Sequence, residues 1–342
     1  MTNLETVPPE LVCDGRPARA PDGVAEVAAG PGPAQVLSAR DVPLGGLRAM
    51  TVRRTLPQRG RSFIGAWCFC DHYGPDDVTV TGGMSVAPHP HTGLQTVSWL
   101  FSGEIEHRDS LGTHAMVRPG ELNLMTAGYG ISHSEVSTPA TTVLHGVQLW
   151  TALPEPDRDT APAFEHHVPP VVHLPDAELR VFLGSLGGST SPVRTYSPLV
   201  GAEILLSAGA LLRLDVDPAF EHGVLVDAGA VSVDGRQGAP GELVYLPTGR
   251  GQVTLQAGGV VGGPGVRLLL IGGLPLGQQI VMWWNFIGRS HDEVVAARSQ
   301  WQAEIGAGPA GAAVTRSRFG IVPGLDPLPA PGLPGIRLIP RE

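Results

Sequence analysis

Apolar and polar residues alternate in short runs along most of the chain, and glycine or proline separates one run from the next. This pattern predicts short β-strands joined by turns. A first group of strands is expected at residues 34–37, 50–54, 63–70, 93–101, 103–109, 114–117, 121–125 and 143–152. A second group is expected at residues 179–184, 202–207, 210–216, 222–228, 230–234, 242–246, 252–256 and 267–272. The chain is therefore predicted to be all-β.

The two groups of strands repeat one internal order. The sequence Pro-Gly-Glu-Leu occurs at residues 119–122 in the first group and again at 240–243 in the second. Such a repeat predicts two copies of one β-barrel. We assign residues 34–155 to the first barrel and 179–289 to the second. Residues 156–178, which are rich in proline and charge, are predicted to be the linker between them.

The remaining segments have other patterns. Residues 1–33 are rich in proline, alanine and glycine without any period, which predicts a flexible N-terminal extension. A turn at 71–75 is expected to end the third strand. A helix is predicted over residues 290–306, with Ser290 as its N-cap. The Pro/Gly-rich tail at 307–342 contains spaced apolar residues and is expected to lie across the barrels as an ordered strap.

Four side chains that can bind a metal occur in two short motifs. His89 and His91 are two residues apart, and so are His133 and Glu135. Alternate residues of a strand share a face, so two facing strands would bring three imidazoles and one carboxylate around one point. This set suits iron, and nickel, copper or cobalt would also bind. The second barrel has only His222 in this role, so we predict that it holds no metal.

Composition excludes several classes of function. The chain has 342 residues and a net charge of −9, which disfavours binding to nucleic acid or to an anionic membrane. None of its 23 basic residues is lysine, which excludes Schiff-base chemistry. Cys13, Cys68 and Cys70 have no disulfide-framework spacing, and Cys68 and Cys70 are expected to fill a barrel core. No secretory signal or membrane span is visible, so a cytoplasmic protein is predicted.

Several longer motifs resemble the pirin family, a group of bicupin proteins. They are the segments 69–75, 89–97, 103–112, 125–131 and 145–150, together with Trp-Asn-Phe at 284–286. The resemblance implies two cupin barrels of jelly-roll type packed face to face, with a metal only in the N-terminal one. The metal implied is Fe(II), with nickel, copper, cobalt, manganese and zinc as alternatives.

By position, the family's metal ligands fall on His89, His91, His133 and Glu135. The family often has glutamate where this chain has Gln95, and this departure leaves Glu135 as the acidic group at the centre. His107 and His145 are interpreted either as residues that orient the ligands or as ordinary hydrogen-bonded barrel residues.

The resemblance implies quercetin 2,3-dioxygenase activity. A flavonol would bind through its 3-hydroxyl, Glu135 would act as ligand and catalytic base, and O2 would open the ring with release of carbon monoxide. The partners expected are therefore a small flavonol-like substrate and O2, without nucleic acid or membrane. The alternative is a metal- or redox-dependent regulatory protein that acts through a protein partner. A monomer is expected, because one chain already supplies both barrels.

Overall fold

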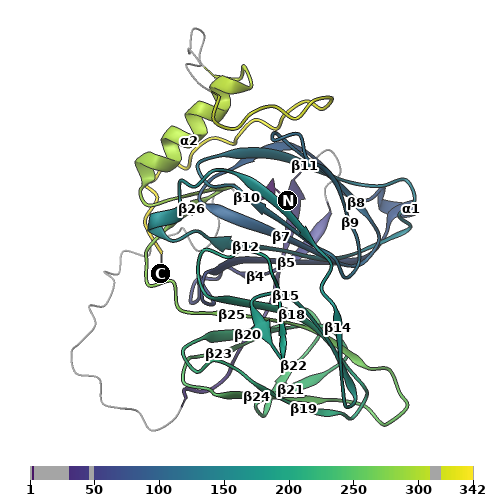
Figure 1. Cartoon of the computed structure of the whole chain (residues 1–342). Helices are drawn as coiled ribbons and strands as arrows, with labels where there is room; N and C mark the ends of the chain where they lie inside the picture. The colour runs from purple at the N-terminus through teal and green to yellow at the C-terminus, as the bar shows by residue number, and fades with distance from the viewer. Residues whose placement is uncertain (1, 4–30, 46–49, 309–316, 342) are drawn as a thin grey trace, which may run out of the picture.

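The computed structural model describes residues 2–3, 31–45, 50–308 and 317–341. It confirms the all-β prediction, because two β-barrels pack face to face and a helix follows the second one in sequence (Figure 1). Most of the predicted N-terminal extension, including Cys13, lies outside the described residues. Across the described ranges, no helix combines the length and the apolar character that crossing a lipid bilayer would require.

The N-terminal barrel consists of two antiparallel sheets. The larger sheet has, in spatial order, β1 (Thr2–Asn3), β3 (Arg40–Gly45), β4 (Thr51–Leu56), β5 (Trp67–Asp77), β12 (Val143–Ala152), β7 (Leu94–Ser102), β10 (Leu122–Thr126) and β13 (Ala163–His167). The smaller sheet has β6 (Ser85–His91), β11 (Ile131–Ser137), β8 (Ile105–Asp109) and β9 (His114–Val117). A one-turn helix, α1 (Val78–Thr81), connects β5 to β6, and a 3₁₀ turn (Glu155–Asp157) follows β12.

The C-terminal barrel repeats this arrangement. Its larger sheet has β14 (Val171–Leu174), β15 (Ala177–Leu183), β18 (Leu199–Leu206), β25 (Val266–Gly273), β20 (Glu221–Ala228), β23 (Leu243–Leu246) and β2 (Gln35–Leu37). Its smaller sheet has β19 (Leu211–Asp215), β24 (Gln252–Ala257), β21 (Val231–Val233) and β22 (Arg236–Gly238). Two hairpins complete the strands: β16 (Ser185–Leu186) with β17 (Ser189–Thr190), and β26 (Val281–Trp283) with β27 (Phe286–Gly288).

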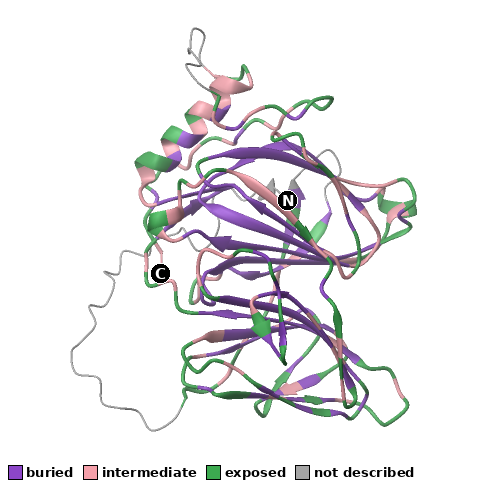
Figure 2. Cartoon of the chain, in the orientation of Figure 1, coloured by how far each residue is buried: buried purple, intermediate pink, exposed green. Residues whose placement is uncertain are grey.

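The larger sheets of the two barrels face each other across one apolar core, and the strands that meet there are almost wholly buried (Figure 2). The ring of Trp99 from β7 lies 4.7 Å from that of Phe182 in β15. Trp67 donates a hydrogen bond from Nε1 to the backbone carbonyl of Gly272, at 3.0 Å. Burial of aromatic and aliphatic surface on this scale makes the pair of barrels one folded unit.

Each barrel lends a strand to the sheet of the other half. Strand β2 precedes the N-terminal barrel in sequence but pairs with β23 of the C-terminal barrel. Strand β13 precedes the C-terminal barrel and pairs with β10 of the N-terminal barrel. Residues 34–37, predicted as the first strand of the N-terminal barrel, therefore belong to the other sheet. Residues 156–178 are not an irregular linker, because β13 and β14 lie within them.

The turn predicted at residues 71–75 is wrong. Strand β5 continues through this segment to Asp77, and its partner β12 follows it with two register shifts. As a result, the side chain of His72 lies inside the sheet that faces the second barrel. There, Nε2 of His72 and Nε2 of His145 both contact a carboxylate oxygen of Asp227 in β20, at 2.7 and 2.6 Å.

The predicted helix is present as α2 (His291–Glu304), and the Ser290 side chain caps it by accepting the N–H of Glu293. Its buried face packs on the β26–β27 hairpin and on the C-terminal tail. The described part of the tail, residues 317–341, lies along α2 and over the N-terminal barrel (Figure 1). The buried ring of Phe319 contacts Trp301 of α2, with ring centroids 5.6 Å apart.

Candidate metal centre

Three of the four predicted ligands converge. His89 and His91 project from β6, and His133 projects from the neighbouring strand β11, where it lies directly opposite His89. The ring centroids are 4.4 to 5.0 Å apart, and the Nε2 atoms of His91 and His133 are separated by 3.1 Å. All three side chains are fully buried. One donor atom from each lies within 4.8 Å of the others, which is close enough for one ion to reach all three.

The donor atoms are in the state that a metal requires. His89 donates from Nδ1 to the carbonyl of Ala87 at 2.9 Å, which leaves the lone pair on Nε2. That Nε2 is buried and has no hydrogen-bond partner among the described residues. Burial lowers the pKa of His89 to about 3, and it also lowers the pKa values of His91 and His133 well below the usual range. Neutral imidazoles with an unshared lone pair fit a divalent transition ion.

Glu135 lies beside this cluster. Strand β6 has an extra residue between the partners of His133 and Glu135, so Glu135 is opposite Val86. A carboxylate oxygen of Glu135 groups with donor atoms of His107 and His133, and Ser98 donates a hydrogen bond to it at 3.1 Å. Glu135 is therefore next to the centre, on the side of His133.

Two further buried residues surround Glu135. The negative charge of Glu135 adds to burial in raising the pKa of Tyr73 well above its usual value, so this phenol stays protonated. The single proton of the Ser98 hydroxyl is shared between Glu135 and Oε1 of Gln148, which lies 2.9 Å away. Sequence reasoning did not single out Tyr73 or Ser98, because neither lies in a motif with metal-ligand spacing. Gln95, the predicted departure, bonds to Thr126 and Thr151.

The C-terminal barrel has apolar residues at the corresponding positions. In its smaller sheet, β19 and β24 take the places of β6 and β11, and the side chains that they bury are Leu212, Leu214, Val253, Leu255 and Ala257. All five pack in the apolar core of that barrel. His222, the lone histidine considered in the sequence analysis, is buried, and neither of its ring nitrogens has a partner among the described residues. The described strands of this smaller sheet thus do not repeat the histidine cluster of the N-terminal barrel.

An apolar cluster forms one wall of the centre. The ring of Trp150 lies 5.2 Å from that of His91, edge to face, and Phe69 stacks on Trp150 at 4.0 Å. Met125, Leu94 and Ile131 belong to the same cluster. Such a wall keeps bulk water away from the imidazoles.

The C-terminal segments cover the centre by bonding to residues next to the ligands. Leu328 donates its N–H to the carbonyl of Pro88, at 2.8 Å. Ser132 donates from Oγ to the carbonyl of Gly320, at 3.1 Å. Ile287 of β27 donates its N–H to the carbonyl of Thr92, at 3.0 Å. One contact thus lies immediately beside each of the three histidines.

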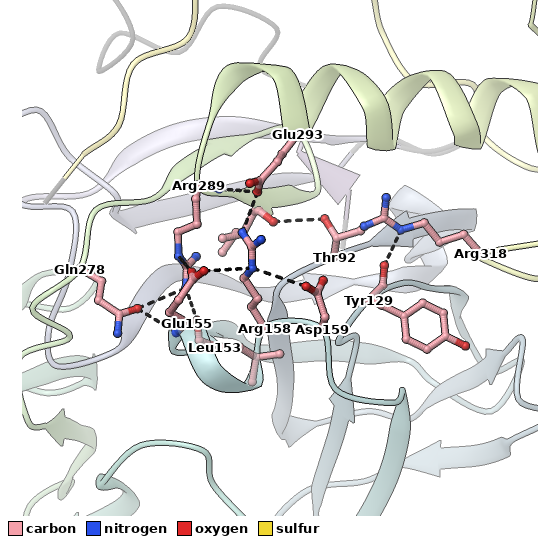
Figure 3. Close-up of polar contacts among 11 residues, drawn as sticks. Thr92, Tyr129, Leu153, Glu155, Arg158, Asp159, Gln278, Arg289, Glu293 and Arg318 are labelled. Atoms are coloured by element: carbon pink, nitrogen blue, oxygen red, sulfur yellow. Dashed lines mark hydrogen bonds and ion pairs between the residues drawn. The ribbon is translucent and has the colours of Figure 1, made fainter.

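A small cavity of about 170 Å³ borders this cover. On one side are Thr92 and Gly93, which directly follow His91, and on the other side is α2. Figure 3 shows its polar rim: Arg158 binds Glu293 at 2.9 Å, and Arg318 of the tail donates to the carbonyl of Tyr129. Ligand sites of small molecules usually have volumes of about 300 Å³ or more. The cavity is therefore too small for a flavonol.

Family comparisons identify the chain. Residues 49–151 match the model of the pirin family, and residues 201–305 match the model of the pirin C-terminal cupin domain. The chain belongs to the pirin family. The first matched segment lies within the N-terminal barrel and contains the candidate metal ligands, and the second covers much of the C-terminal barrel together with α2.

Other pirins and related structures agree with this assignment. A protein of Pseudomonas aeruginosa named "Putative quercetin 2,3-dioxygenase PA1205" is 46% identical over 269 residues, which cover 78% of this pirin and 83% of the relative. A pirin-like protein of Caulobacter vibrioides is 35% identical, over 78% of this chain and 92% of the relative. The crystal structure of a quercetin 2,3-dioxygenase from Acinetobacter baumannii has a TM-score of 0.78 and 37% identity, covering 89% of this chain and 97% of its own.

A structure that contains a metal shares the fold of this pirin. The bacterial pirin of Escherichia coli in complex with nickel(II) has a TM-score of 0.56 at 18% identity, over 71% of this chain and 99% of its own.

Proposed function

We propose that this chain is a metal-dependent dioxygenase that opens flavonols such as quercetin with O2. The observation that carries the proposal is the convergence of three buried, neutral imidazoles, of which His89 has an unpartnered Nε2. A buried carboxylate, Glu135, lies beside them. The names of the related proteins from P. aeruginosa and A. baumannii support the choice of substrate.

His89, His91 and His133 would hold the ion, and Glu135 would be its fourth ligand. A bound ion of this type supplies a Lewis acid and, in the case of iron, redox chemistry with O2. A set of imidazoles and one carboxylate without thiolate favours Fe(II), and nickel, copper, cobalt, manganese and zinc are the alternatives.

The surrounding residues have separate tasks in this proposal. Glu135, oriented by the hydroxyl of Ser98, accepts the proton of the flavonol 3-hydroxyl. Trp150 and its apolar neighbours pack against the flat ring system and exclude water. Gln95 is held by two threonines and takes no proton, so the base role falls on Glu135.

Substrate entry requires the cover to move. The three histidines have no exposed surface, and the adjacent cavity is too small for quercetin. The contact between Arg318 and Tyr129 joins the tail to the loop that precedes β11, so its release is the step that would widen the cavity.

Metal content and O2 consumption test the proposal. The purified wild type should contain close to one transition-metal ion per chain, and His89→Ala should lose it. Wild type with quercetin should consume O2, and Glu135→Gln should lose at least ~100-fold in kcat, the lower range of general-base contributions. His114→Ala, at an exposed position of the same barrel, is the control and should match wild type. Wild type without metal, or turnover unchanged in Glu135→Gln, would contradict the assignment.

A regulatory role is the second candidate, and one observation favours it. The tail bonds directly to Pro88 and Ser132, the neighbours of two ligands, so a change at the centre would be transmitted to the protein surface. Stoichiometric metal without turnover on a panel of flavonols, together with a tail that changes its protease sensitivity with metal oxidation state, would support this role over catalysis.

A further inference from the structure

A further buried histidine, His107, contacts His133. Strand β8 pairs with β11, which places Asp109 opposite His133 and His107 opposite Glu135. The Nδ1 atoms of His107 and His133 are 3.4 Å apart, and Nε2 of His107 is 3.3 Å from Oδ2 of Asp109. All three side chains are buried. Asp109, His107 and His133 thus form a line of hydrogen-bonded side chains, which leads from a carboxylate through one imidazole to an imidazole of the candidate metal centre.

The backbone sets the direction of the hydrogen bonds along this line. Oδ1 of Asp109 accepts the N–H groups of Leu111 and Thr113, at 2.9 and 3.1 Å. Its Oδ2 is therefore the oxygen that accepts the hydrogen bond from His107. Because a carboxylate only accepts, His107 must donate from Nε2, and its Nδ1 is left with a lone pair. His133 must then donate from Nδ1, which leaves the lone pair of His133 on Nε2, where it faces the metal centre.

The C-terminal barrel supplies an internal comparison. The strand that takes the place of β8 in its smaller sheet is β21 (Val231–Val233), which contains no histidine. The sheet that lacks the ligand histidines thus also lacks a counterpart of His107. The ring of His107 is further held by Phe164 of β13, at 4.8 Å, so that its orientation is fixed by packing.

We propose that Asp109 and His107 are positioning residues that hold His133 in the tautomer that binds metal and strengthen its Nε2 as a ligand. The inference rests on the proposed metal centre and adds two residues to it. Partners behind a ligating histidine usually change metal affinity by about 10- to 100-fold when they are removed.

Asp109→Asn is the most informative variant. It reverses the direction of the hydrogen bonds from residue 109 through His107 to His133, and the asparagine side chain has nearly the same shape as that of aspartate. The amide oxygen must still accept from Leu111 and Thr113, so the amide nitrogen faces His107 and donates to it. His107 then has to donate from Nδ1, and His133 is driven to carry its proton on Nε2. His107→Leu removes the line, whereas His107→Gln keeps one donor and one acceptor. Glu106→Gln, on the same strand with its side chain in an exposed ion pair, is the matched control.

The full-length protein stripped of metal gives two readouts. The ¹⁵N imidazole spectrum should show His133 protonated on Nδ1 in wild type and on Nε2 in Asp109→Asn. The dissociation constant for Co(II), measured by chelator competition, should rise at least tenfold in Asp109→Asn and His107→Leu. It should stay near that of wild type in Glu106→Gln and lie between the two in His107→Gln.

The outcomes separate this inference from the proposed function. If wild type binds Co(II) no better than His89→Ala, the metal centre is overturned, and the positioning role with it. If wild type binds Co(II) and Asp109→Asn binds within twofold of it, the positioning role alone is overturned. Protonation of wild-type His133 on Nε2 would also overturn the positioning role, and this readout does not depend on whether His107→Leu folds.

Discussion

Asp227 of the C-terminal barrel lies 2.7 Å from Nε2 of His72 in the N-terminal barrel, and both side chains are fully buried. Its second oxygen binds Arg267, also at 2.7 Å. Burial opposes its ionisation, but hydrogen bonds from His145, His72 and Arg267 hold the pKa of Asp227 far below its usual range. A single carboxylate thus joins two strands of one barrel to the other barrel.

Asp227→Ala should lower the free energy of unfolding by about 3 kcal/mol or more, because the imidazoles and Arg267 lose their buried partner. Urea denaturation measures the change. Asp215→Ala, at an exposed position on β19, is the control and should change the stability by less than ~0.5 kcal/mol. A loss as small for Asp227→Ala as for Asp215→Ala would contradict the role of this contact.

His222 should make stability depend on pH. Burial lowers the pKa of His222 to about 4 in the folded protein, whereas in the unfolded chain it should be near 6.5. Between these values the unfolded state binds a proton that the folded state does not, so the free energy of unfolding should fall as the pH falls from about 6.5 to about 4.

His222→Leu should remove this contribution, and the stability difference between variant and wild type should grow by about 3 kcal/mol across that range. Denaturation curves at several pH values measure it. His173→Leu, at an exposed site, should keep the wild-type slope. Equal slopes for His222→Leu and wild type would show that His222 does not titrate in this way.

Phe319 should hold the tail in place. Its ring is buried against Phe286 and Trp301, so Phe319→Ala should cost about 3 kcal/mol in stability. If the tail covers the metal centre, the same variant should also lose bound metal to a chelator several times faster. Ile321→Ala, two residues further on and 78% exposed, should match wild type in both measurements. A destabilised Phe319→Ala that releases metal at the wild-type rate would separate the tail from the centre.

Cys68 and Cys70 should not react with thiol reagents in the folded protein. Burial raises the pKa of both thiols to about 12, and neither side chain is exposed. In a Cys13→Ser background, a thiol reagent such as dithiobisnitrobenzoate should modify them only as fast as the protein unfolds. Ser185→Cys, at an exposed position, is the positive control. Rapid modification of native Cys68 or Cys70 would disprove their burial.

Local pattern was sufficient for much of the fold and for the grouping of three candidate ligands. The period of two in β6 and β11 placed His89, His91 and His133 on common faces, and the structure brings them together. The same rule placed Glu135 on the face of His133, and its carboxylate does lie with His133 and His107. It is offset from His89 and His91, because the extra residue in β6 shifts the register between His133 and Glu135. Periodicity within one strand carries no information about irregularity in its neighbour.

Long-range pairing was beyond the reach of sequence patterns. His72 and Asp227 are far apart in the chain, and no local signal connects them. Strand β13 is short, charged and flanked by prolines, so its pattern favoured a linker, and only its pairing with β10 makes it a strand. The direction of the bonds through His107 and Asp109 likewise depends on which backbone N–H groups Asp109 accepts.

The exchange of β2 and β13 makes the two barrels unequal during synthesis. Strand β13 follows its partner β10 by only about 40 residues in the chain. The sheet of the N-terminal barrel can therefore be completed soon after β10 is synthesised. Strand β2 can pair with β23 only after about 200 more residues have been synthesised. The loop closed by this pairing contains the whole N-terminal barrel. A C-terminal fragment expressed alone would lack β2 and present β23 as an open edge, which is a site for aggregation. The N-terminal half can thus fold first and serve as the template on which the second half assembles.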